Sequence, residues 1–156
     1  MCDLPKRHSG ADREPRRAVL DTQVVLDWLV FRDVGVAPLA RELECGSLRW
    51  LTSQPMREEL EHVLDRGVAA AWLPDRPAIS LTYDRLAVHV EAGAHCAPRL
   101  LCSDPDDQMF IDLALTSGAH WLFTRDRALL RLARRARERG VIVLRPADWE
   151  PLMAST

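Results

Sequence analysis

Acidic side chains that directly follow apolar stretches are the residues best placed to do chemistry. Asp21 comes immediately after the apolar run 18–20, and Asp126 follows the run 120–124 after a single residue. If both runs are strands of a parallel sheet, their carboxyl ends meet at one edge. Carboxylates gathered there repel one another unless a cation lies between them. Oxygen ligands without a histidine or cysteine pattern favour Mg²⁺ or Mn²⁺, and such a site suits metal-assisted phosphodiester hydrolysis.

Two further acids lie on segments expected to be helices that reach the same edge. Asp107 is in the first turn of a helix expected over 105–117, and the helical repeat aligns it with Phe110 on the apolar face. Glu59 borders the apolar face of a helix expected over 55–66. Both side chains are therefore directed toward the protein rather than into the solvent.

Each acid also has a purely structural interpretation. Asp126 would cap the helix that follows it, and Asp107 would be favourable near a helix N-terminus. Glu59 would be one of three solvated glutamates in its helix. Asp21 is the hardest to explain in this way, unless a helix starts directly after it. The convergence of all four acids is more specific than any one of them.

The elements that must position these acids alternate between strands and helices. Apolar runs predict strands over 18–20, 48–51, 120–124 and 141–144. Apolar periodicity and Pro or Gly boundaries predict helices over 24–31, 36–45, 55–66, 79–92, 105–117 and 127–139. This order predicts an α/β fold with a parallel sheet covered on both faces. The expected organisation is a flexible tail over 1–17, a single domain over 18–150 and a short C-terminal tail over 151–156.

The charge distribution suggests a polyanionic partner. Residues 125–145 contain eight arginines against two acids, a net charge of +6, although the whole chain carries −2. An arginine-rich helix beside an acidic site would hold the phosphates of a nucleic acid. The alternative is a helix face that arginine merely keeps in solution. The candidate RNA-binding residues are Arg125, Arg127, Arg131, Arg134 and Arg135.

Several other classes of protein are disfavoured by the sequence. No stretch approaches the roughly 20 apolar residues of a membrane helix, and the N-terminal residues lack the apolar run of a signal peptide. We therefore expect a cytoplasmic protein without a membrane partner. The four cysteines show no CxxC spacing, which argues against a zinc site. Neither GxxxxGK[ST] nor GxGxxG occurs, which disfavours the common nucleotide-binding folds.

Three stretches of the chain resemble the PIN domain, a family of metal-dependent ribonucleases. They are AVLDTQVVLDWLV near the start, MREELEHVLDR in the middle and CSDPDDQMFIDLALTSGAHWLFTRDRALL toward the end. The resemblance covers about residues 18–150 and is strongest to toxin components of bacterial toxin–antitoxin pairs. It implies a three-layer α/β/α sandwich with a central parallel sheet.

The resemblance also implies roles for individual residues. Asp21, Glu59, Asp107 and Asp126 look like the catalytic, metal-binding acids, with Asp104 as an accessory ligand. Thr22 and Thr124 look like supporting polar residues, and Gln23 stands where the family usually has asparagine. The family further implies one or two Mg²⁺ or Mn²⁺ ions, a small antitoxin partner and a homodimer.

These observations predict an endoribonuclease that depends on a divalent metal and acts as the toxin of a toxin–antitoxin pair. Two alternatives remain open at this stage. One is a PIN-like module that binds RNA or protein without cutting it, and the other is a housekeeping RNA-processing nuclease.

Overall fold

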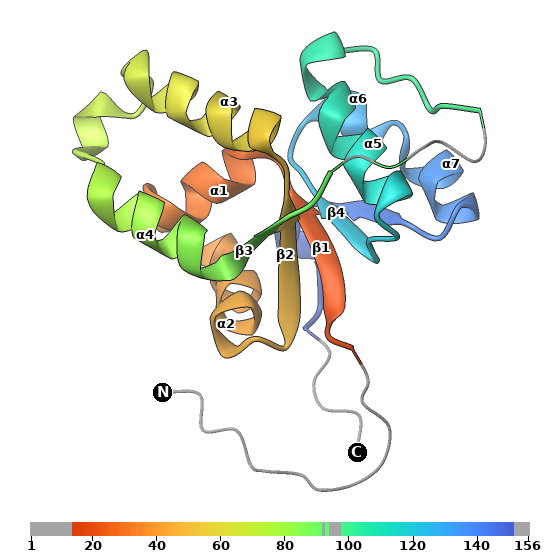
Figure 1. Cartoon of the computed structure of the whole chain (residues 1–156), viewed down its shortest axis with the longest axis horizontal. Helices are drawn as coiled ribbons and strands as arrows, with labels where there is room; N and C mark the ends of the chain where they lie inside the picture. Colours follow the sequence, from red (N-terminus) through yellow and green to blue (C-terminus); the bar gives the residue numbers. More distant parts are fainter. Residues whose placement is uncertain (1–13, 92, 94–97, 152–156) are drawn as a thin grey trace, which may run out of the picture.

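A parallel sheet of five strands, in the order β3-β2-β1-β4-β5, runs through the centre of the protein (Figure 1). The computed structural model describes residues 14–91, 93 and 98–151. The strands are β1 (Arg16–Leu20), β2 (Leu48–Thr52), β3 (Ala87–His89), β4 (Trp121–Phe123) and β5 (Ile142–Leu144). All neighbouring strands pair in parallel, and β1 lies in the middle. The carboxyl ends of β1 and β4 are therefore adjacent.

Alternating side chains of the strands supply two separate cores, one on each face of the sheet. In β4, Trp121 and Phe123 pack into one core, whereas Leu122 packs into the other. In β1, Leu20 and Val19 divide in the same way. This period of two is the geometry of a strand that is buried on both faces.

Helices cover both faces of the sheet and complete three layers (Figure 1). On one face lie α1 (Thr22–Leu29), α2 (Ala37–Cys45), α3 (Gln54–Asp65) and α4 (Arg76–Leu86). On the other face lie α5 (Gln108–Thr116), α6 (Arg127–Leu130) and α7 (Ala133–Glu138). The predicted α/β/α sandwich is thus confirmed.

The structure corrects three of the expected boundaries. The helix expected over 79–92 ends at Leu86, because residues 87–89 pair with β2 as the edge strand β3, which the sequence analysis missed. The helix expected over 127–139 is two helices, because the N–H of Leu132 bonds to the carbonyl of Leu129, three residues back. The tail expected over 1–17 is too long, because Arg16 and Arg17 belong to β1.

Outside these boundaries, residues 1–13 and 152–156 of the predicted tails lie beyond the described part of the chain. Within the described part, no helix is long and apolar enough to cross a membrane.

The central strands predict where substitutions will destabilise the fold. Leu122 in β4 is fully buried, so Leu122→Ala is expected to lower the free energy of unfolding by about 2–5 kcal/mol through reduced burial and a cavity. Urea denaturation followed by circular dichroism measures this change. Leu81→Ala is the control, because Leu81 is 69% exposed, and it is expected to change stability by no more than about 0.5 kcal/mol. Equal effects of the two substitutions would contradict the assigned core.

Candidate functional site

Asp21 joins the sheet to the first helix. It follows β1 directly, its N–H bonds to the carbonyl of Phe123 in β4, and its side chain is 4% exposed. The Asp21 Oδ1 atom accepts a hydrogen bond from the Val24 N–H at 2.9 Å and so caps α1. The helix does start directly after Asp21, so this residue has the structural role that the sequence analysis left open. Its second oxygen, Oδ2, faces the loop after β4.

Thr124 connects Asp21 to the loop that carries Asp126. Its hydroxyl donates to Asp21 Oδ2 and accepts from the Asp126 N–H at 3.0 Å. Asp126 Oδ1 accepts from the N–H groups of Ala128 and Leu129 at 2.7 and 3.3 Å, which caps α6. Asp126 is therefore a helix cap and also a member of the acidic site described below. These contacts place Thr124 between the two acids, and its role as a supporting residue of the site stays a prediction.

Asp104 and Asp107 come to the same place from the turn before α5. The short 3-10 helix Pro105–Asp107 begins after Asp104, which caps it by accepting from the Asp106 N–H at 3.0 Å. Carboxylate oxygens of Asp104, Asp107 and Asp126 all lie within 4.8 Å of one another, and each residue is partly buried. We call these three residues the acidic cluster. The helix α5 packs against β1 and β4, which places the turn over this edge of the sheet.

Burial, together with nearby like charges, raises the pKa values of Asp107 and Asp21. Burial and, after it, the nearby charges of Asp126, Asp104 and Asp21 together raise the pKa of Asp107 to about 7. Burial also raises the pKa of Asp21 to about 6, against the hydrogen bonds from Thr124, Val24 and Arg125, which lower it. Asp21 therefore lies close enough to the acidic cluster to interact with it electrostatically.

Glu59 lies near this edge but outside the acidic cluster. It is partly buried on α3, between the more exposed Glu58 and Glu61, and its Oε2 atom accepts a hydrogen bond from the hydroxyl of Thr22. Thr22 follows Asp21 directly, so one hydrogen bond connects Glu59 to the residue beside the site. Its proposed role as a metal ligand stays a prediction.

The hydrogen bond of the Gln23 side chain goes to Asp27 and not to Asp21 or the acidic cluster. The side-chain amide of Gln23 donates to Asp27 Oδ1, one turn further along α1, at 2.9 Å. Gln23 is exposed, whereas Asp27 is buried with 3% of its surface accessible.

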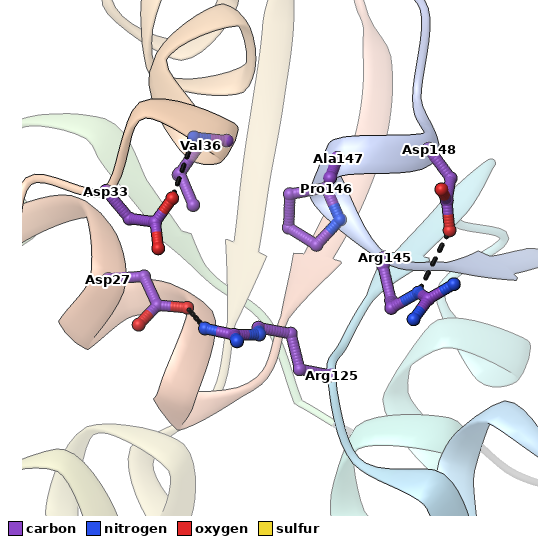
Figure 2. A pocket seen from close by; sticks show the side chains of 9 residues that line it. Asp27, Asp33, Val36, Arg125, Arg145, Pro146, Ala147 and Asp148 are labelled. Atoms are coloured by element: carbon purple, nitrogen blue, oxygen red, sulfur yellow. Dashed lines mark hydrogen bonds and ion pairs between the residues drawn. The ribbon is translucent and has the colours of Figure 1, made fainter.

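Arg125, a candidate RNA-binding residue, is directed away from the acidic cluster. Its Nη1 donates to Asp27 Oδ2 at 2.8 Å, and its side chain lines a cavity of about 360 Å³ together with Asp27, Asp33, Arg145 and Asp148. Figure 2 shows the Arg125 side chain reaching from its loop to Asp27 on α1. The other four candidates are exposed on or beside α6 and α7; they are Arg127, Arg131, Arg134 and Arg135.

The donor set fits a hard divalent cation. Within the described residues, Asp21 and the acidic cluster form no ion pair with an arginine, lysine or histidine. Carboxylate oxygens are the ligands that Mg²⁺ and Mn²⁺ prefer. A bound cation would stabilise the ionised forms of Asp107 and Asp21, which burial and nearby like charges disfavour.

Comparison with known proteins agrees with this geometry. The sequence profile of the PIN domain matches residues 17–128. The chain belongs to the PIN domain family. No curated protein matches the chain significantly. Among solved structures, the chain is similar to a crystal structure of VapBC2 from Rickettsia felis bound to a DNA fragment from their promoter. The two share 12% sequence identity and a TM-score of 0.53 over 81% of this chain and 96% of that chain. At this identity, the match supports the PIN fold alone.

Two residues of this PIN domain's site region, Asp27 and Cys102, were not predicted from the sequence. Asp27 lies within the apolar stretch that predicts α1 and is therefore interpreted as part of that helix. A charged residue in such a stretch is itself a sign that the side chain has a buried partner. Cys102 is a buried free thiol, and burial raises its pKa, with the charges of Asp107, Asp126 and Asp104 adding to the increase. In the metal-free protein, the Cys102 thiol is therefore protonated at neutral pH.

The raised pKa values predict how the stability of the metal-free protein depends on pH. In the folded state, Asp107 and Asp21 bind protons up to about pH 7 and 6, whereas in the unfolded state they release them near 3.8. The folded state thus binds more protons in this window, so stability falls as pH rises from about 4 to 7.

Asp107→Asn is expected to weaken this dependence, because the substituted side chain does not titrate. Urea denaturation in EDTA between pH 4.5 and 8 measures the effect, and Asp106→Asn, in the same turn but exposed, is the matched control. The assignment is wrong if both variants keep the slope of the wild type.

Proposed function

We propose that this PIN domain is an endoribonuclease that depends on Mg²⁺ or Mn²⁺. The observation that carries the proposal is the acidic cluster: three carboxylates within 4.8 Å of one another beside a buried fourth, Asp21. Keeping these carboxylates ionised side by side costs free energy, which a bound cation would offset. One or two ions are compatible with this donor set.

Each residue of the site has a distinct part in the proposed reaction. When bound, the cation would lower the pKa of an attacking water and neutralise charge on the phosphate and the leaving oxygen. Oxygen atoms of Asp104, Asp107 and Asp126 would hold the cation. Asp21 would add a further negative charge beside it, and Glu59 would be a further ligand from α3. Thr124 holds Asp21 and the Asp126 backbone in register by donating to one and accepting from the other. Thr22 orients Glu59.

The biological role that we propose is that of a bacterial toxin held by a small antitoxin. The support is the sequence resemblance, together with the fold shared with a protein of the VapBC2 complex from Rickettsia felis. A cytoplasmic location and a homodimer belong to the same proposal, since the proposed substrate is RNA and the family resemblance implies dimers. The alternatives are a housekeeping nuclease and a non-catalytic module, and the cleavage experiment below tests the second.

The first prediction concerns cleavage. The purified protein is expected to cut a labelled mixed RNA pool with Mn²⁺ or Mg²⁺ and to be inactive in EDTA. Asp107→Asn should lower the rate by about 100-fold or more, since even residues that only support metal ligands contribute about 10–100-fold. Asp106→Asn is the matched control and is expected to keep the wild-type rate. Cutting that survives both EDTA and Asp107→Asn would contradict the proposed site; Mn²⁺ binding without cutting would favour the non-catalytic module.

The second prediction concerns RNA binding by the arginine-rich helices. Replacing Arg134 and Arg135 with glutamate is expected to weaken binding of single-stranded RNA, because these side chains would no longer neutralise phosphates. The slope of log K against log salt should fall by roughly 0.7 for each phosphate that the variant no longer neutralises. Fluorescence anisotropy at several salt concentrations measures both quantities in EDTA, where RNA stays intact. Replacing Arg41 and Arg66, two exposed arginines on the other face, is the control. Equal decreases in both variants would indicate only a net-charge effect.

A further inference from the structure

Asp27 is a buried acid that the proposed chemistry does not use. It lies on α1, six residues after Asp21, and 3% of its surface is exposed. A buried carboxylate is costly unless hydrogen bonds and a counter-charge compensate it. Asp27 has both, because Gln23 Nε2 donates to Oδ1 at 2.9 Å and Arg125 Nη1 donates to Oδ2 at 2.8 Å.

Arg125 connects this buried acid to the acidic site. The residue lies between Thr124 and Asp126, and its backbone N–H points to Asp21 Oδ2 at 3.4 Å. Its side chain leaves the loop in the other direction and ends on Asp27 (Figure 2). The loop is therefore attached to α1 at two places, at the helix N-terminus through Asp21 and nearly two turns later through Asp27.

We propose that Asp27 is a positioning residue that acts through Arg125 and fixes the loop 124–126 against α1. In this arrangement, Asp126 keeps its place in the acidic cluster, and Thr124 keeps its hydrogen bond to Asp21. Gln23 holds the Asp27 carboxylate from the opposite side. This assigns Gln23 and Arg125 to the support of the site, and the inference rests on the proposed function only in requiring that the site binds a divalent cation.

Mn²⁺ affinity of the full-length protein tests this role, measured by isothermal titration calorimetry well below the unfolding temperature. Asp27→Asn keeps the shape of the side chain and removes its charge. It is expected to weaken Mn²⁺ binding by about tenfold, as removal of a group that orients metal ligands typically does. Arg125→Gln should weaken binding to a similar extent, and the double variant should be no worse than either single one, because both act through one contact. Arg125→Lys, which keeps the positive charge, should recover part of the affinity.

Three controls make the outcomes distinct. Asp65→Asn removes one partner of an ion pair with Arg76, on the α3–α4 side of the protein, and should leave Mn²⁺ affinity unchanged. Thermal unfolding in EDTA shows whether each variant is folded at the titration temperature. Asp107→Asn should abolish Mn²⁺ binding.

If Asp27→Asn and Arg125→Gln keep the wild-type affinity while Asp107→Asn loses it, Asp27 is only structural and the inference is overturned, but the proposed function stands. If the wild type binds no Mn²⁺, both are overturned.

Discussion

Burial of the Asp21 carboxylate is the constraint on which the rest of the site depends. This group ends the central strand, caps α1, and receives the hydroxyl of Thr124 and the N–H of Arg125. A single residue thereby fixes the start of α1 and the position of the loop after β4, and it adds a negative charge beside the acidic cluster. Burial disfavours the charged form of Asp21. A cation bound at this edge of the sheet would stabilise that charged form.

The parallel sheet converts this local constraint into a shared site. The pairing of β1 with β4 brings the ends of the two strands together, although Asp21 and Asp126 are more than 100 residues apart in sequence. The packing of α5 on the same two strands then adds the turn that carries Asp104 and Asp107. The acids that would bind the cation destabilise the metal-free fold when they are ionised, as their raised pKa values indicate. A bound cation would remove this destabilisation.

The elements and the acids could largely be predicted from the sequence, because buried parallel strands are continuous apolar runs and their ends are marked by polar residues. The sequence does not reveal the contacts between segments that are distant along the chain or the hydrogen bonds that interrupt a helix. Strand β3 is three residues long and directly follows α4, so it is recognised by its pairing with β2 rather than by a sequence pattern of its own. The break between α6 and α7 lies at the hydrogen bond from the Leu132 N–H to the Leu129 carbonyl, and the helical periodicity of the sequence does not reveal it. The side chain of Arg125 was expected to face RNA, and it faces Asp27 because a buried carboxylate requires a partner.

Anomalous diffraction from crystals grown with Mn²⁺ would show whether the acidic cluster holds the ion, because it locates the ion without relying on activity. We expect an anomalous peak within coordinating distance of carboxylate oxygens from Asp104, Asp107 and Asp126, and no such peak in Asp107→Asn crystals. The proposed metal site would be contradicted if no peak appears at saturating Mn²⁺ in crystals where this edge of the sheet is open to solvent. A peak coordinated by other residues would contradict it as well.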